Sequence, residues 1–252
     1  MPNPTASIIV IGNEILSGRT QDVNVQFLAS RLGGMGISLR EVRVIPDIRA
    51  TIIDTVNELR ARFDHVFTTG GIGPTHDDIT SPCIAEAFGV PWEPHEPTMR
   101  MMQAHYAPGE FNAARQRMAT LPRGARPIEN PVSMAPGFSI GNVHVMAGVP
   151  RIMRAMFDAL APELEGGLPV KSVTMHAERL LEGSLADPLE RIQMEFPDLD
   201  IGSYPFERPD GRRGVALLAK GTDDDALEAA RLRIEALIGS LGHTPIAGEP
   251  AP

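Results

Sequence analysis

TTGGIGPTHDDIT, residues 68–80, is the most informative stretch of this chain, and we call residues 70–79 of it the signature loop. The apolar run before it, residues 64–69, predicts a short buried strand. Ser81-Pro82 after it predicts a helix N-cap followed by proline at the first helical position. A loop that joins a strand to a helix start in an open α/β sheet lies at the carboxyl edge of the strands, where ligands usually bind.

The glycines and threonines of this loop suit a phosphorylated ligand. Gly70, Gly71 and Gly73 would let the backbone come close to phosphate oxygens, and the hydroxyls of Thr69 and Thr75 would add donors. The helix start adds free N–H groups and a partial positive charge. A Walker loop has a lysine after its glycines, and this loop has none. The third glycine of a dinucleotide-binding motif is also missing. The alternative is that the glycines only permit a tight turn.

Two adjacent carboxylates, Asp77 and Asp78, follow the glycines and would repel a bare phosphate. A divalent cation resolves this conflict, because Mg²⁺ is typically held by one or two carboxylates together with substrate phosphates. The alternative is that these carboxylates cap the helix and compensate its dipole. His76, inside the loop, is a candidate general acid or base. The alternative is that the neighbouring carboxylates hold it as a charged surface partner.

The residues before the signature loop alternate between strand and helix patterns. Ser7–Ile11 is a continuous apolar run that predicts a central strand, and residues 39–45 predict a second one. Apolar residues recur at helical spacing in residues 25–35 and 52–63. This βαβαβ order predicts the α/β fold class, with helices on both faces of a mostly parallel sheet.

The end of the first domain is marked by a hairpin, residues 138–146, and by a helix over residues 150–161. The Pro- and Gly-rich residues 161–169 predict a linker. We therefore expect a large domain over residues 1–163 and a small α+β domain over residues 168–252, in which the pattern runs β-α-β-β-α.

The overall composition argues against several functions. The net charge of −9 over 252 residues excludes the basic footprint of a nucleic-acid-binding protein or of a protein that binds acidic membranes. The single cysteine, Cys83, allows no intrachain disulfide. Neither a signal peptide nor an apolar run long enough for a membrane span is visible, so we expect a cytoplasmic protein with no membrane partner.

Five segments resemble the molybdopterin-binding fold of MogA and MoaB and, in particular, the N-terminal part of the CinA (competence/damage-inducible) family. Their order and spacing match over roughly residues 6–160. They are the signature loop, IGNEILSG at residues 11–18, DVN at residues 22–24, NPVSMAPGF at residues 130–138, and GVP at residues 148–150 with Met153. The resemblance implies a three-layer MogA/MoaB-like domain followed by a small KH-like domain. In the small domain, GRRG at residues 211–214 has the spacing of an RNA-binding loop, but its position between two strands predicts a hairpin turn, and we expect no nucleic-acid partner.

The same resemblance implies roles for particular residues. Asp78 and Asp47 match two acidic positions of the family, and with Asp77 they are the carboxylates expected around a Mg²⁺-like ion and a diphosphate, as catalytic or metal-binding groups. Further polar contacts to the ligand are expected from three residues, namely Glu14, Asn24 and Asn130. For Glu14 the alternative is a helix-start carboxylate near the dipole.

Three functions follow from the resemblance. The first is a metal-dependent pyrophosphatase that cleaves an ADP-ribose-like nucleotide diphosphate. The second is a molybdopterin adenylyltransferase, for which molybdopterin is the ligand, and the third is a non-catalytic pterin- or nucleotide-binding protein. The chain stops before the C-terminal amidase domain of a full CinA, so deamidation is not expected. A homo-oligomer is expected, with a dimer as first choice.

Overall fold

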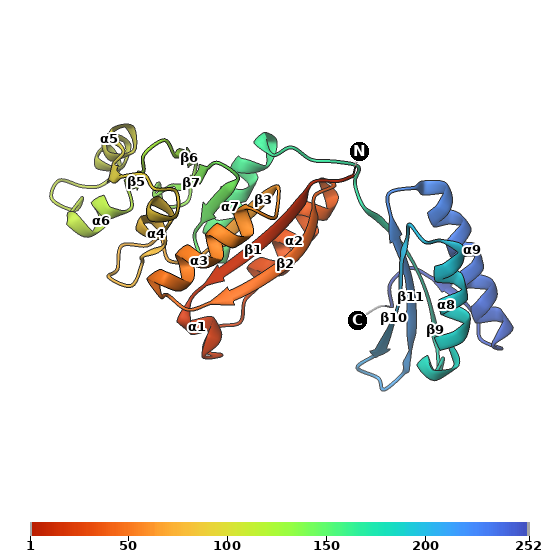
Figure 1. The fold of residues 1–252 in the computed structure, drawn as a ribbon. Coiled ribbons are helices and arrows are strands. Elements are labelled where there is room, and N and C mark those ends of the chain that lie inside the picture. The colour runs from red at the N-terminus through yellow and green to blue at the C-terminus, as the bar shows by residue number, and fades with distance from the viewer. Residues whose placement is uncertain (1, 251–252) are drawn as a thin grey trace. The chain divides into compact units, whose positions relative to one another are not determined.

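The computed structural model describes residues 2–250, which fold into two compact units. The large unit ends at Gly167 and the small unit begins at Leu168. Figure 1 follows the chain through both units. Each unit has a hydrophobic core of its own, so each is described separately.

The large unit is built on a six-stranded sheet in the order β2-β1-β3-β8-β7-β6. The first four strands of that order are parallel, and β7 and β6 are added antiparallel. β7 and β8 form the predicted hairpin. The strands are β1 Thr5–Ile11, β2 Ser38–Ile45, β3 His65–Thr69, β6 Arg126–Ile128, β7 Gly137–Ile140 and β8 Val143–Met146.

Helices cover both faces of this sheet. α2 and α7 pack on one face, and α3 and α4 pack on the other. The predicted α/β class with a mostly parallel, doubly covered sheet is confirmed. The helices of this unit are α1 Asn13–Leu16, α2 Asn24–Gly34, α3 Arg49–Arg60, α4 Thr80–Ala87, α5 Glu96–His105, α6 Ala113–Arg117, α7 Pro150–Leu160 and the short 3₁₀ turn η1 Ala161–Glu163.

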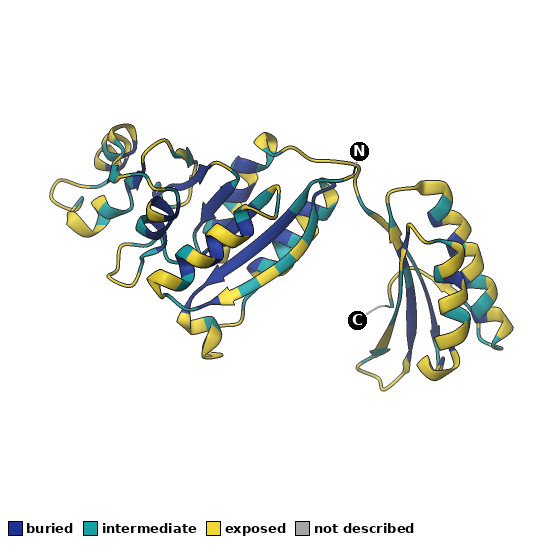
Figure 2. Ribbon diagram, viewed as in Figure 1, coloured by how far each residue is buried: buried dark blue, intermediate teal, exposed yellow. Residues whose placement is uncertain are grey.

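β1 lies at the centre of the core, as its continuous apolar run predicts (Figure 2). Ile8 and Val10 face the cluster under α2 and α7, whereas Ile9 and Ile11 face the cluster under α3 and α4. All four side chains are at most 3% exposed. Full burial of such a side chain is typically worth about 1.5–3 kcal/mol, so this one strand fixes both layers of helices to the sheet.

Residues 88–125 form an insertion between α4 and β6. It contains α5, α6 and a two-stranded antiparallel sheet of β4, Trp92–Pro94, and β5, Thr120–Pro122. A small cluster around Met102 and Ala119 forms its core. The insertion brings α6 close to the signature loop.

The small unit is a four-stranded antiparallel sheet in the order β10-β11-β9-β12, with α8 and α9 packed against it. Residues 208–212 close the hairpin between β10 and β11, so GRRG lies at the end of the predicted hairpin turn and the start of β11. The Asp223 side chain caps α9 by accepting the N–H groups of Asp225 and Ala226. The elements are β9 Lys171–Glu178, η2 Glu182–Ser184, α8 Ala186–Glu195, β10 Asp200–Glu207, β11 Arg213–Gly221, α9 Asp224–Ser240 and β12 Ile246–Ala247.

One predicted helix start is wrong. α4 begins at Thr80, one residue before the expected cap, and no side chain caps it. The Ser81 hydroxyl instead donates to the Thr120 carbonyl oxygen and accepts from the Trp92 indole N–H, because the insertion offers it these partners. Within residues 2–250, none of the helices is long and apolar enough to cross a membrane.

Candidate functional site

The parallel strands β2, β1, β3 and β8 end at one edge of the large sheet, and the loops that follow them carry most of the predicted site residues. The loop after β3 is the signature loop. Asp47 follows β2, Glu14 follows β1, and Gly148 follows β8. The topology therefore confirms that these segments share the carboxyl edge of the sheet.

The glycines of the signature loop have packing reasons of their own. Gly70 adopts φ +104°, and a Cβ there would lie 2.1 Å from the Ile11 carbonyl oxygen at the end of β1. A Cβ on Gly73 would lie 2.6 Å from a carboxylate oxygen of Asp78. Gly70 therefore excludes a side chain and lets the loop pack tightly against β1, and Gly73 leaves room for the Asp78 carboxylate.

Asp78 is fixed within the loop by Thr75. The Thr75 backbone N–H donates to Asp78 Oδ2 at 2.8 Å, and the Thr75 hydroxyl donates to the same oxygen. Asp78 is partly buried, whereas the neighbouring His76 and Asp77 side chains are exposed, at 97% and 66%. The Thr75 hydroxyl and the Asp77 backbone N–H lower the pKa of the Asp77 carboxyl. Thr75 thus organises the carboxylates, a role that differs from the predicted donation to a ligand.

The other two carboxylates at this edge are held by the short helix α1. Asp47 Oδ2 accepts the Asn13 backbone N–H at 2.9 Å, which connects the end of β2 to the start of α1. The Glu14 carboxylate folds back over Gly12, where a Cβ would lie 2.5 Å from it. Glu14 lies in the first turn of α1 and is exposed, as its alternative interpretation predicts.

No group of three or more His, Cys, Asp or Glu side chains in residues 2–250 is placed to hold a metal ion. The expected ring of Asp47, Asp77 and Asp78 around one ion is therefore not formed in this structure. The physical reason is that Asp47 is engaged by α1 and Asp77 points to solvent. A cation held by one carboxylate and by ligand phosphates remains compatible with Asp78, because one of its carboxylate oxygens carries both bonds from Thr75.

Two buried polar side chains at this edge each have an oxygen without a hydrogen-bond partner. Asn24 Nδ2 donates to the Gly148 carbonyl oxygen at 2.8 Å, but Asn24 Oδ1 has no hydrogen-bond partner. The Thr69 hydroxyl, at the end of β3, has none either. Asn24 is 4% exposed and Thr69 is 1% exposed. Buried polar atoms are usually paired, so these two can accept or donate to a group that enters from outside.

Asn130 has a different role from the predicted one. Its Nδ2 donates to the Ser133 hydroxyl and to the Ala135 carbonyl oxygen, and its Oδ1 accepts the Val132 and Ser133 backbone N–H groups. A side-chain amide has two donors and two acceptor sites, so all four are used within its own loop. Asn130 therefore shapes the loop of residues 130–135 and presents no free polar atom to a ligand in this structure.

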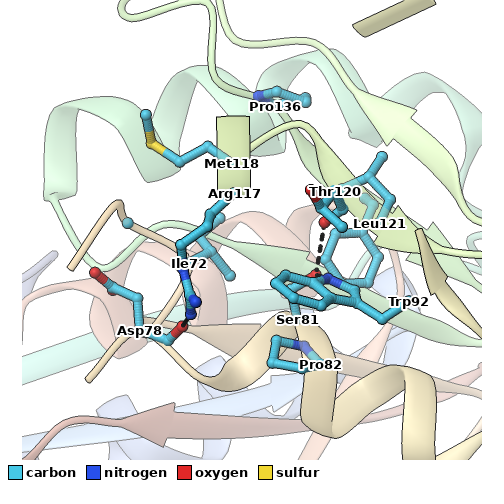
Figure 3. A pocket seen from close by; sticks show the side chains of 12 residues that line it. Ile72, Asp78, Ser81, Pro82, Trp92, Arg117, Met118, Thr120, Leu121 and Pro136 are labelled. Carbon is cyan, nitrogen blue, oxygen red and sulfur yellow. Dashed lines mark hydrogen bonds between the residues drawn. The ribbon is translucent and has the colours of Figure 1, made fainter. Parts of the chain in front are cut away.

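A pocket beside the signature loop is lined by a positively charged side chain, Arg117, which the sequence alone did not identify as a site residue (Figure 3). Arg117 reaches from α6 toward the loop, where its Nη2 donates to the Asp78 carbonyl oxygen at 3.4 Å. Its guanidinium lies 5.5 Å from the centre of the Trp92 ring, and its Nε is buried without a partner. The pocket is lined by Ile72, Gly73, Asp78, Ser81, Pro82, Trp92, Arg117, Met118, Thr120, Leu121, Pro136 and Phe138.

An open α/β sheet with a glycine-rich loop and polar side chains at its carboxyl edge defines a small-molecule-binding domain. A family model described as a probable molybdopterin binding domain matches residues 7–166. The chain belongs to this molybdopterin-binding domain family, and its large unit has the MogA/MoaB-like fold. The middle domain of FAD synthase matches residues 171–242 of the small unit.

Individual relatives agree with this assignment. A protein from Aeropyrum pernix is 34% identical, and the match covers 96% of this chain and 97% of that protein. A CinA-like protein from Citrifermentans bemidjiense is 34% identical over 87% of this chain and 54% of its own length. The crystal structure of a CinA of unknown function from Thermoplasma acidophilum is 34% identical, with a TM-score of 0.60 over 64% of this chain and 97% of that one. The resemblance to the CinA family is confirmed.

Proposed function

We propose that this protein is a metal-dependent pyrophosphatase that cleaves an ADP-ribose-like nucleotide diphosphate. The observation that carries the proposal is the signature loop, which holds the Asp78 carboxylate beside the uncapped start of α4 at the carboxyl edge of the sheet. A helix start favours an anion, and a carboxylate favours a cation, so a metal-bound diphosphate suits both.

The roles of the residues follow from their contacts. Asp78 would hold the cation, which when bound supplies charge neutralisation and a more acidic water. Thr75 orients the Asp78 carboxylate through its two hydrogen bonds. The buried Asn24 Oδ1 would accept an N–H or O–H group of the ligand, and the Thr69 hydroxyl would pair with another polar group. Attack of water on phosphorus breaks one P–O bond of the anhydride and gives AMP and ribose 5-phosphate.

The match of the small unit to a domain of FAD synthase supports the same ligand class, because FAD also contains an AMP unit joined through a diphosphate. The match of the large unit to a molybdopterin-binding family favours a second candidate, a molybdopterin adenylyltransferase. The two candidates share the phosphoanhydride linkage and differ in the direction of the reaction and in the pterin.

The test is AMP release from ADP-ribose in the presence of Mg²⁺ or Mn²⁺, measured by chromatography. Asp78→Asn keeps the size of the side chain and removes its charge, so activity should fall by at least about 100-fold, or ~2.7 kcal/mol. Asp54→Asn makes the same change on an exposed position of α3 and is the matched control. Equal activity of the Asp78 and Asp54 variants contradicts the proposal. Adenylylation of molybdopterin with Mg-ATP, without AMP release from ADP-ribose, favours the second candidate.

A further inference from the structure

The guanidinium of Arg117 is a positive charge without a counter-ion. Among residues 2–250 it forms no ion pair. It makes one long hydrogen bond to the Asp78 backbone oxygen of the loop, and it lies over the Trp92 ring of β4. Arg115, two residues earlier on the same helix, instead stacks on Tyr106 and pairs with Glu110. A buried donor of a charged group that lacks a partner destabilises the fold, typically by about 1–3 kcal/mol or more.

The surroundings of Arg117 point to an anion as its missing partner. The Asp78 carboxylate is close by in the pocket lining, yet Arg117 contacts the Asp78 backbone oxygen, and the carboxylate takes its bonds from Thr75. The guanidinium therefore keeps donors available, including the buried Nε–H. A guanidinium that offers Nε–H and Nη–H together matches two oxygens of a phosphate.

The size of the cavity limits which part of a ligand can enter it. Its volume is about 10 Å³, which is room for one water-sized group. A phosphate oxygen fits this space, whereas a base or a sugar ring does not. The pocket can thus bind an anionic oxygen of a ligand, and the rest of the ligand must lie outside the pocket.

We infer that Arg117 is the anion-binding residue of the signature-loop site, where its guanidinium binds an oxygen of the ligand's phosphate group in the cavity beside Asp78. The inference rests on the proposed function and deepens it, because it assigns recognition of the phosphate to a residue of the inserted segment. Two neighbouring aspartates repel a diphosphate, and Arg117 offsets that repulsion together with the cation. Arg117 is a binding and positioning residue, and the inference gives it no part in proton transfer.

The chain offers a direct probe, because Trp92 is its only tryptophan and lies against the Arg117 guanidinium. Inorganic pyrophosphate is titrated into the wild-type protein, and the Trp92 fluorescence is recorded. A calorimetric titration gives the dissociation constant. We expect saturable binding with a change in fluorescence. Arg117→Gln should weaken binding about 10- to 100-fold, the range for loss of a hydrogen bond to a charged group. Arg117→Lys keeps the charge without the planar fork and should restore part of the affinity.

Arg115→Gln is the matched control, because it removes the same charge from the same helix and should bind pyrophosphate like the wild type. An unfolding curve of each variant, followed by circular dichroism, separates loss of binding from loss of fold. Wild-type binding that Arg117→Gln leaves unchanged overturns the inference, and so does an absence of pyrophosphate binding to the wild type. If pyrophosphate binds through Arg117 but ADP-ribose is not cleaved, the inference stands and the proposed hydrolase activity fails.

Discussion

Lowering the pH should destabilise the large unit through one buried imidazole, His144 of β8. Burial, with smaller contributions from the neighbouring His65 and Arg126, lowers the pKa of His144 to about 3. His144 Nδ1 lies 2.9 Å from the Ser139 hydroxyl, its Nε2 lies 3.3 Å from His65 Nδ1, and His65 Nε2 lies 3.2 Å from the Glu165 carbonyl oxygen. His144 is therefore neutral in the folded protein at neutral pH.

For two neutral imidazoles these contacts allow one arrangement of protons. The Glu165 carbonyl oxygen can only accept, so His65 Nε2 carries a hydrogen and His65 Nδ1 accepts from His144 Nε2–H. His144 Nδ1 then accepts from the Ser139 hydroxyl. In this arrangement the neutral His144 ring uses both of its nitrogens in hydrogen bonds.

The size of the effect follows from proton linkage. In the unfolded chain His144 has a pKa near 6.5, so the unfolded state binds a proton that the folded state does not bind until about pH 3. The contribution to stability is fully present above pH 6.5 and is lost as the pH falls from 6.5 toward 3. Between pH 7.5 and pH 5.0 the loss is about 2 kcal/mol.

Urea unfolding followed by Trp92 fluorescence measures this for the large unit, because the only tryptophan lies there. The free energy of unfolding of the wild type and of His144→Gln is compared at pH 7.5 and pH 5.0, so that carboxylates common to both proteins cancel. The wild type should lose about 2 kcal/mol more than the variant on acidification. His105→Gln, which removes an exposed imidazole from the same unit, should behave like the wild type. An identical pH dependence for wild type and His144→Gln would refute the reasoning.

Two substitutions test the local structure. Gly70→Ala places a Cβ 2.1 Å from the Ile11 carbonyl oxygen at φ +104°. The free energy of unfolding of the large unit, measured in urea, should therefore fall by more than about 2 kcal/mol. Gly33→Ala is the control and should be neutral or stabilising, because Gly33 lies in a helix and its Cβ would meet nothing within 4 Å. A tolerated Gly70→Ala would show that the loop is not packed against β1 as described. Asp223→Ala removes the cap of α9 and should destabilise the small unit by about 1 kcal/mol, measured as faster amide exchange in the first turn of that helix. Unchanged exchange there would mean that the cap contributes nothing to α9.

The strands and turns that depend on residues close together in the sequence could be predicted. The apolar run of Ser7–Ile11 has the residues of a strand buried on both faces, and Gly141-Asn142 has the chemistry of a two-residue turn. Each of these features depends on neighbours in the sequence, so the residues alone were sufficient.

The site was predicted only in part, because its contacts join distant segments. Ser81 has the residue type of an N-cap, but its hydroxyl pairs with groups that the insertion brings to it. Arg117 lies 39 residues from Asp78 in a segment without a regular pattern, so no spacing rule connects the two. Asn130 was identified as a ligand contact by resemblance, while its amide is saturated by its own loop. The roles assigned to Asp47, Asp77 and Asp78 in catalysis or metal binding remain predictions.

The distribution of unpaired polar atoms supports the position of the site independently of any motif. Six side chains in residues 2–250 have a buried nitrogen or oxygen without a partner, and three of them, Asn24, Thr69 and Arg117, lie at the carboxyl edge or beside the signature loop. Each such atom typically destabilises a fold by about 1–3 kcal/mol, which the surrounding packing must offset. A ligand that supplies an N–H or O–H group to Asn24 and an anionic oxygen to Arg117 would remove that penalty on binding. Thermal unfolding should therefore shift upward with pyrophosphate, and Arg117→Gln should reduce the shift while raising the melting temperature of the free protein. If Arg117→Gln instead lowers the melting temperature of the free protein, the Arg117 donors already have partners in the fold.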